Sequence, residues 1–197
     1  MTPAFHFLLL TLSIGLIDQT LGRPYDGPKE PPPVLLVDDC PEGWHGYLLS
    51  CYKFGLDYVT QAGAKAACKE LASSLVAIET EDENDFLGRK ISDIYYTNTP
   101  WRRRDGYEQW WTGGVRDGDG WAWEDSTSGE KTPVTYTDWH DPEPNGASRG
   151  EDFLTLVFNR NRSYSKQTIG WNDNDGSESS THRFICEMDP ITWPLLQ

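Results

Sequence analysis

Apolar residues recur at helical spacing in two segments of the chain. The first predicted helix spans residues 60–73, and four residues make up its inward face: Ala64, Ala67, Cys68 and Leu71. The second begins at a capping box over residues 80–83, whose acidic side chains suit the positive end of the helix dipole. Four residues continue that helix inward: Phe86, Leu87, Ile91 and Ile94. A short apolar run, 75–78, predicts a buried strand between the helices.

The second half of the chain changes to a pattern of strands and turns. Two aromatic runs, 110–115 and 121–124, flank a turn-forming stretch rich in Asp and Gly, and they predict neighbouring strands. Apolar runs at 153–158 and 183–187 predict further strands. Two early helices followed by a predominantly antiparallel remainder indicate an α+β fold.

Composition fits one domain of ordinary size, without a repeat of fixed period. Nine tryptophans, nine tyrosines and seven phenylalanines can form a substantial core, which argues against global disorder. The formal net charge of −14 opposes nucleic acid and anionic membrane surfaces as partners. The same charge favours cations and solubility outside the cell.

The N-terminus has the features of a signal peptide, predicted over residues 1–22. Its apolar run, Ala4–Ile17, is shorter than the roughly 20 residues that a membrane span needs, and small residues lead to a cleavage site after Gly22. No Lys or Arg precedes the run, which departs from the usual pattern. We therefore expect a secreted, extracellular protein without membrane insertion.

The mature chain divides by composition into three parts. Residues 23–39 carry five prolines and little apolar surface, so they predict an extended linker. Residues 40–188 form the predicted domain. Residues 189–197 are left as a C-terminal tail.

Four cysteines predict a disulfide framework once secretion is accepted, because thiols oxidise outside the cell. Three pairings are possible, and the residues alone leave them open. Cys40 and Cys51 bracket a turn-rich segment that a bond would close into a hairpin. In that case Cys68 and Cys186 would tie the first helix to the last strand.

Side-chain oxygens gather in two short clusters late in the chain. The first is Trp-His-Asp-Pro-Glu-Pro-Asn at 139–145, followed by Glu-Asp at 151–152, and the second is Trp-Asn-Asp at 171–173. Hard cations such as calcium take six to eight oxygen ligands, which Asp, Glu and Asn side chains supply. Neither Cys nor His dominates the clusters, which argues against zinc and copper. The two clusters therefore predict a calcium site.

The order of these motifs resembles that of C-type lectin-like domains. The likeness covers residues 40–188 and rests on five features: Cys68, Trp110-Trp111-Thr112-Gly113-Gly114, Glu143-Pro144-Asn145, Trp171-Asn172-Asp173 and Phe184-Ile185-Cys186-Glu187. It implies the C-type lectin-like fold, with two helices, antiparallel sheets and a long calcium-binding loop region. The early cysteine pair resembles the N-terminal hairpin of the long form of this domain. The implied disulfides are Cys40–Cys51 and Cys68–Cys186.

The resemblance also implies a role for the two oxygen clusters. Members with Glu-Pro-Asn bind calcium and a sugar together, and two sugar hydroxyls complete the coordination of the metal. Carried over by position, five residues are both metal ligands and sugar-binding residues: Glu143, Asn145, Glu151, Asn172 and Asp173, the last also through its backbone oxygen. The Glu-Pro-Asn order resembles that of mannose, fucose and N-acetylglucosamine binders, whereas galactose binders usually show Gln-Pro-Asp. By the same analogy the Glu143–Pro144 bond is cis.

Several positions depart from the family pattern. Phe153 and Gly176 stand where most members have a second inner disulfide, so we expect weaker binding or a loop whose order depends more on calcium. Asp117 and Asp152 are candidates for an auxiliary metal site, although Gly146 stands where an acid is often placed.

Other polar and aromatic features have simpler interpretations. The sequon Asn-Arg-Ser that starts at Asn161 predicts glycosylation on an exposed loop. Trp139 and Trp171 are interpreted as core residues rather than sugar-stacking platforms. His140 is expected to be a solvent-exposed loop residue, and the arginines at 102–104 to form a solvated loop.

We therefore expect a secreted calcium-dependent lectin that recognises mannose-type glycans, for instance on microbial surfaces in innate immunity. The alternative is an acidic extracellular matrix or biomineral-associated interaction protein that uses the same fold with little sugar binding. A glycoside hydrolase is disfavoured, because the acids are assigned as ligands or helix starts and no nucleophile–base pair emerges. A homo-oligomer stays open, since no collagen repeat or heptad predicts how weak sites would cluster.

Overall fold

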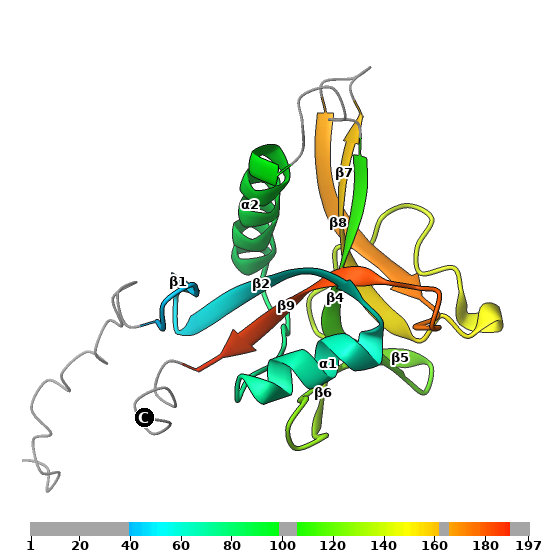
Figure 1. Ribbon diagram of the computed structural model, residues 1–197. Coiled ribbons are helices and arrows are strands. Elements are labelled where there is room, and N and C mark those ends of the chain that lie inside the picture. The colour runs from blue at the N-terminus through cyan, green and yellow to red at the C-terminus, as the bar shows by residue number, and fades with distance from the viewer. Residues whose placement is uncertain (1–39, 99–105, 162–165, 190–197) are drawn as a thin grey trace, which may run out of the picture. The chain divides into compact units, whose positions relative to one another are not determined.

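A mixed sheet carries the two helices of the structure (Figure 1). The computed structural model describes residues 40–98, 106–161 and 166–189, so the predicted signal peptide, the linker and the tail after residue 189 lie outside it. Within the described residues the sheet has nine strands: β1 (His45–Tyr47), β2 (Ser50–Val59), β3 (Ser74–Leu75), β4 (Gly106–Asp117), β5 (Gly120–Glu124), β6 (Lys131–Pro133), β7 (Phe153–Asn161), β8 (Lys166–Asn174) and β9 (His182–Met188). The main path runs β1-β2-β9-β4-β5-β6, and β7 pairs with both β4 and β8.

The strand pairing confirms the predominantly antiparallel class, with one exception. Strands β4 and β9 run parallel, with Trp110 opposite Arg183. The prediction of a strand over 75–78 was wrong in extent, because β3 ends at Leu75. The Val76 N–H still donates a hydrogen bond to the Ile185 carbonyl, and the Val76 side chain is fully buried, as the apolar pattern predicts. Strands β6 and β8 were not predicted, because their sequences are mainly polar.

Both predicted helices form, and each begins at a threonine cap. In α1 (Gln61–Glu70) the Thr60 hydroxyl accepts the Gly63 N–H at 3.2 Å, and in α2 (Glu81–Asn98) Thr80 accepts the Glu83 N–H at 3.2 Å. Leu71 was wrongly placed on the inward face. It is 39% exposed, because the helix ends before it and Leu71 is the C-terminal cap. No helix of the described residues is long and apolar enough to cross a membrane.

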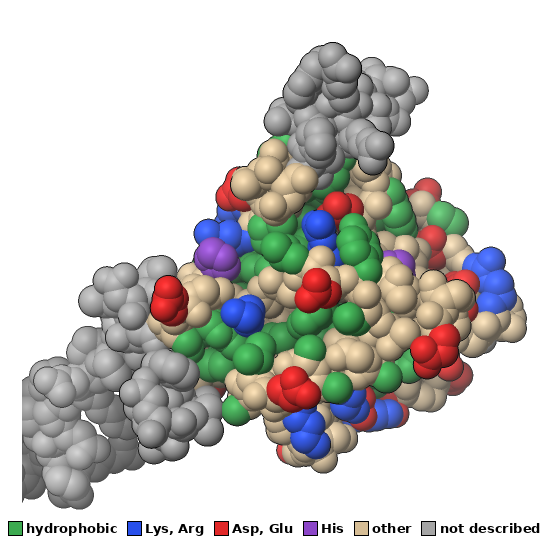
Figure 2. All heavy atoms as spheres, viewed as in Figure 1, with side chains coloured by type: hydrophobic (Ala, Val, Ile, Leu, Met, Phe, Trp, Pro, Cys, Tyr) green, Lys and Arg blue, Asp and Glu red, His purple; other side chains and the backbone are tan. Residues whose placement is uncertain are grey.

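Two disulfides attach the first hairpin and the first helix to the rest of the domain. Cys40 is bonded to Cys51 and closes the β1–β2 hairpin, while Cys68 on α1 is bonded to Cys186 on β9. These are the pairings that the family resemblance implied. The described residues belong to one compact unit of the chain. Its surface, viewed from the side of Figure 1, carries hydrophobic groups broken up by charged side chains (Figure 2).

Three strand segments extend beyond the rest of the sheet. The first half of β4, from Gly106 to Trp111, pairs with β7, and β7 pairs with β8. We call these three strand segments the arm. Helix α2 lies beside the arm (Figure 1). A Cβ on Gly88 of α2 would lie 2.6 Å from the Ile169 side chain of β8, so glycine permits this close packing.

An aromatic ring packs on Gly176, one of the two positions to which the family resemblance assigned an inner disulfide. The Phe153 ring packs directly on the Cα of Gly176, so closely that an added Cβ would overlap it. The same ring makes an edge contact with the buried Trp111, at 6.5 Å between centroids. The Phe153 ring therefore contacts the segment after β8 at Gly176, and the expected dependence of loop order on calcium stays a prediction.

Replacing Phe153 by Ala should release this segment. We expect Phe153→Ala to lower the free energy of unfolding by about 2 kcal/mol, because it removes a partly buried ring and leaves a cavity. Urea denaturation measures the change, and hydrogen exchange should speed up in residues 174–181. Leu48→Ala, at a side chain that is 68% exposed, serves as the control and should change stability by less than about 0.5 kcal/mol. A Phe153→Ala protein as stable as this control would contradict the packing role.

Two carboxyl groups share a partly buried site between α2 and β9. Glu83 is buried and accepts a hydrogen bond from the Tyr52 hydroxyl at 2.7 Å, while Glu187 accepts the Ala77 N–H at 3.1 Å. Burial, followed by the negative charge of Glu83, raises the pKa of Glu187 to about 7. The folded protein therefore keeps a proton on Glu187 at pH values where the unfolded chain has lost it.

This raised pKa predicts a pH dependence of stability. The folded state binds more protons than the unfolded state between the ordinary glutamate value and pH 7, so the free energy of unfolding falls as pH rises through that window. Glu187→Gln should flatten this fall by up to about 3 kcal/mol, because a neutral amide keeps the Ala77 bond without a charge. Urea denaturation from pH 4 to pH 8 tests this. An equal slope in Glu187→Gln and in the exposed control Glu42→Gln would contradict it.

Candidate functional site

Trp171 of β8 connects the segment of the first oxygen cluster to the second cluster. Its indole is fully buried, and Nε1 donates to Asn84 Oδ1 of α2 at 2.9 Å. Its backbone N–H donates to the Asp138 carbonyl at 2.7 Å, and its own carbonyl accepts the His140 N–H at 3.0 Å. The chain that leads into the first oxygen cluster is thus attached to β8 directly before the second cluster. The interpretation of Trp171 as a core residue is confirmed.

Asp173 holds the Glu-Pro-Asn loop against β8. Its carboxylate is almost fully buried and accepts the backbone N–H groups of Asn145, at 3.1 Å, and of Gly146, at 2.8 Å. The Arg116 guanidinium lies 3.4 Å from the same carboxylate and balances its charge. One side chain of the second cluster therefore sets the position of the first.

The five predicted ligands line one cleft of about 330 Å³. Its complete lining is Glu143, Asn145, Arg149, Glu151, Asn172, Asp173, Asn174, Asp175 and Ser180. Residues 28 positions apart in the sequence thus meet, as the motif order implied. The Asp173 backbone oxygen, expected as a further ligand, accepts a hydrogen bond from the Asn172 amide.

Arg149 was missed by the sequence reasoning, although it lies in the cleft. It is the last residue of the short 3₁₀ turn Ala147–Arg149, and its Nε lies 3.3 Å from Glu151 Oε1. Its Nη2 also donates to the side-chain oxygen of Asn145. A cationic side chain therefore contacts two of the five predicted ligands. No motif marks this residue, because its role follows from the path of the loop.

Glu143 carries an acceptor without a partner. Its Oε2 is buried and makes no hydrogen bond within the described structure. Desolvation, followed by the hydrogen bond and charge of Asp173, raises the pKa of Glu143 above its usual range. The Glu143–Pro144 bond is cis, as the resemblance implied, and the Asp141–Pro142 bond is cis as well.

The donor set of the cleft suits a hard cation. All five predicted ligands offer oxygen, three as carboxylates and two as amides, and the unpartnered Glu143 Oε2 adds a free acceptor. Among the described residues, no three His, Cys, Asp or Glu side chains are grouped closely enough to hold a metal by themselves. A cation at this cleft would therefore depend on the amides of Asn145 and Asn172 as well as on the acids.

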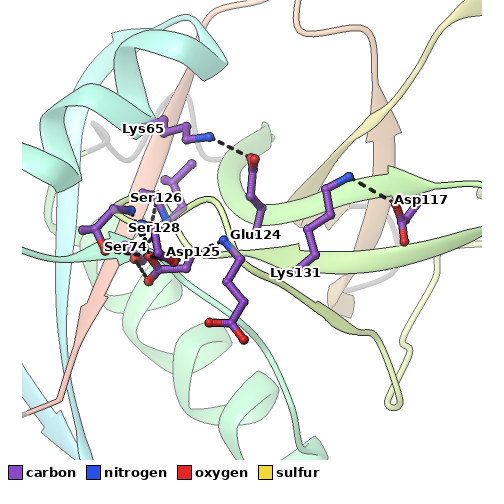
Figure 3. Close-up of polar contacts among 11 residues, drawn as sticks. Lys65, Ser74, Asp117, Glu124, Asp125, Ser126, Ser128 and Lys131 are labelled. Atoms are coloured by element: carbon purple, nitrogen blue, oxygen red, sulfur yellow. Dashed lines mark hydrogen bonds and ion pairs between the residues drawn. The ribbon is translucent and has the colours of Figure 1, made fainter.

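The two candidates for an auxiliary metal site each form an ion pair with a different basic side chain. Asp117, at the end of β4, pairs with Lys131 of β6 at 3.1 Å (Figure 3). Asp152 pairs with the Arg116 Nε at 2.9 Å. Figure 3 also shows Asp125, which accepts hydrogen bonds from Ser74 and Ser128 and closes a turn rather than facing the cleft.

Two polar residues beside the cleft differ from expectation. His140 was predicted to be solvent-exposed, but its ring lies on Gly170, with Nδ1 2.9 Å from the place of a Cβ, and its Nε2 is buried. Gln109 of β4 was not singled out, yet its Oε1 accepts from Thr155 at 2.7 Å and from Asn172 at 3.4 Å. Polar positions on strand faces carry no recognisable motif, which is why the sequence did not reveal Gln109.

Two further predictions fall on undescribed parts of the chain. Asn161 is the last residue of β7, but its side chain and the rest of the sequon lie outside the described residues. The arginines at 102–104 lie outside them too.

Comparison with known sequences gives one family. The lectin C-type domain matches residues 58–188 of this chain. C-type lectin domain family 4 member E of Mus musculus is 31% identical over 155 residues, which are 78% of this chain and 62% of that protein. The match spans 30% of the low affinity immunoglobulin epsilon Fc receptor of Mus musculus and 62% of C-type lectin domain family 6 member A of Homo sapiens. These proteins therefore extend beyond the region they share with this chain.

Comparison with solved structures gives the same fold. The Ca²⁺-independent C-type lectin SPL-2 from Saxidomus purpuratus aligns with a TM-score of 0.57 and 26% identity, over 78% of this chain and 96% of that one. The cow carbohydrate-recognition domain of CD23, solved in the presence of a GlcNAc2Man3 oligosaccharide, aligns with a TM-score of 0.53 and 26% identity, over 76% and 95%. The two disulfides, the helix pair and the mixed sheet agree with this fold. With a domain match over more than half of its length, the chain belongs to the C-type lectin domain family, whose members generally bind carbohydrate and are not enzymes.

Proposed function

We propose that this protein is a secreted, calcium-dependent lectin of mannose-type specificity. The observation that carries the proposal is the meeting of three carboxylates and two amides in one cleft, with a buried Glu143 oxygen that lacks a partner. A bound calcium ion would give this oxygen a positively charged partner and would coordinate sugar hydroxyls. Glu143, Asn145, Glu151, Asn172 and Asp173 would hold the ion.

The same side chains would select the sugar. Carboxylates accept hydrogen bonds from hydroxyls, whereas amides donate them, so the order of acids and amides decides which pair of hydroxyls fits. Glu143 before Asn145 gives the order associated with mannose, fucose and N-acetylglucosamine. The solved cow CD23 domain, which was studied with a mannose-containing oligosaccharide, supports a glycan as the ligand class.

Secretion is the location that suits this function. Two disulfides hold the domain, and such bonds persist in oxidising compartments outside the cytosol. The predicted signal peptide would deliver the chain there, and the negative net charge suits a soluble extracellular protein.

Retention on mannose-coated beads tests the proposal. We expect binding in calcium, release by a chelator, and release by free mannose but not by free galactose. The double variant Glu143→Gln with Asn145→Asp should reverse this sugar preference, because it exchanges the acid and amide positions around Pro144.

Two results would count against this function. Sugar binding that persists after chelation would contradict calcium dependence. This result is a real alternative, because one of the similar solved structures is a Ca²⁺-independent lectin. Retention on none of the sugars would remove the lectin proposal and favour the acidic matrix or biomineral protein, which the net charge of −14 also suits.

Arg149 predicts a measurable limit on calcium affinity. Its guanidinium contacts Glu151 and Asn145, so an ion that takes up these oxygens has to displace it. Arg149→Gln should therefore tighten calcium binding by up to about fivefold, the range expected when an exposed ion pair no longer competes. Calorimetric titration at constant ionic strength measures this.

The matched control for this variant is Arg89→Gln. Arg89 lies on α2, and its ion pair within the described part of the chain is a long contact of 4.0 Å to Asp85, so its replacement changes the net charge without touching the cleft. If both variants alter calcium affinity equally, a general charge effect explains the change and direct competition by Arg149 is excluded. Unchanged affinity in Arg149→Gln would also exclude it.

A further inference from the structure

Tyr107 stands exposed on the arm, close to the cleft. It belongs to β4, 54% of its surface is exposed, and none of the described residues stacks on its ring. In the pairing of the arm, Tyr107 lies opposite Asn159 of β7, which in turn lies opposite Thr168 of β8. Residues paired across strands point to the same face, so a ring, an amide and a hydroxyl stand side by side. We call these three residues the shelf.

The shelf shares its face of the sheet with one proposed ligand. Alternate residues of a strand point to the same side, so Tyr107 and Gln109 share a face and their Cα atoms are about 7 Å apart along β4. Gln109 in turn accepts a hydrogen bond from Asn172 at 3.4 Å. The shelf therefore lies on the same face of the sheet as Asn172, which lines the cleft.

The chemistry of the shelf suits a second sugar ring. The C–H face of a pyranose is apolar and slightly positive, so it packs on the negative face of an aromatic ring. An amide offers both donor and acceptor groups to sugar hydroxyls, and a threonine hydroxyl does the same. Asn159 is exposed and Thr168 is partly exposed, so both can reach a ligand lying on the ring.

We propose that the shelf is a second sugar subsite, in which Tyr107 stacks on the residue next to the one held in the cleft. Asn159 and Thr168 bond the hydroxyls of that second residue. The ligand class is then an oligosaccharide rather than a single sugar. This proposal rests on the proposed function of the cleft and adds the part of the glycan that the arm would read.

The chain offers a matched control on the opposite face of the sheet. Tyr58 of β2 is 57% exposed, nearly the same as Tyr107. The Arg183 guanidinium lies 5.3 Å from its ring and pairs with Glu108, the neighbour of Tyr107 that points to the other side of β4. Removing the Tyr58 ring therefore deletes a similar exposed surface away from the shelf.

The test compares one sugar with three. Calorimetric titrations in calcium use methyl α-mannoside and a linear mannotriose, with the wild type, Tyr107→Ala, Tyr107→Phe and Tyr58→Ala. We expect the wild type to bind mannotriose about five to ten times more tightly than the monosaccharide, the gain that one aromatic stacking contact provides. Tyr107→Ala should lose this advantage and keep its monosaccharide affinity, whereas Tyr107→Phe and Tyr58→Ala should retain both.

The outcomes separate the two proposals. Equal wild-type affinity for both sugars would overturn the subsite and leave the calcium lectin intact. A trisaccharide advantage that survives in Tyr107→Ala would also overturn it. If neither sugar binds in calcium, the proposed function itself fails, and the subsite fails with it. Equal melting temperatures of the three variants and the wild type exclude misfolding as the cause of any loss.

Discussion

The burial of Trp171 is the constraint on which the rest of the site depends. Its ring makes edge contacts with Trp123, Tyr136 and Trp139 at 5.5 to 5.6 Å between centroids, and its Nε1 is satisfied by Asn84. Because leaving a buried indole N–H unpaired costs free energy, the bond to Asn84 favours this position of β8 against α2, and the backbone bonds of Trp171 attach the incoming loop. The polar residues that follow on β8 therefore emerge at a defined place on the surface.

Arginine side chains contact two of the acids that line the cleft. Arg116 balances the buried Asp173, which anchors the Glu-Pro-Asn loop through two backbone N–H groups. Arg149 neutralises Glu151 on the open side of the cleft. Phe153 adds packing on Gly176, at the start of the segment between β8 and β9. An ion that enters the cleft would therefore compete with Arg149 for Glu151.

The sequence predicted those parts of the molecule that repeat a local rule. Helical spacing located α1 and α2, the capping box marked the start of α2, and the order of the motifs indicated that Glu143 and Asp173 meet in one cleft. It failed where tertiary contacts decide. Strand β8 is polar along much of its length, so no apolar period marks it, and its pairing with β7 makes it a strand. The positions of Arg149, Gln109 and the partly buried His140 also depend on how the loop crosses the sheet, which no residue spacing reports.

The most direct test of the central claim follows individual backbone amides. A ¹H–¹⁵N correlation spectrum would be recorded on the apo protein, after adding calcium, and again after adding methyl α-mannoside. The account predicts that calcium moves the signals of Asn145, Gly146 and Asp173 first, and that mannoside then moves signals around the same cleft only when calcium is present. Calcium shifts elsewhere in the domain with no change at these three amides would contradict the assignment of the cleft.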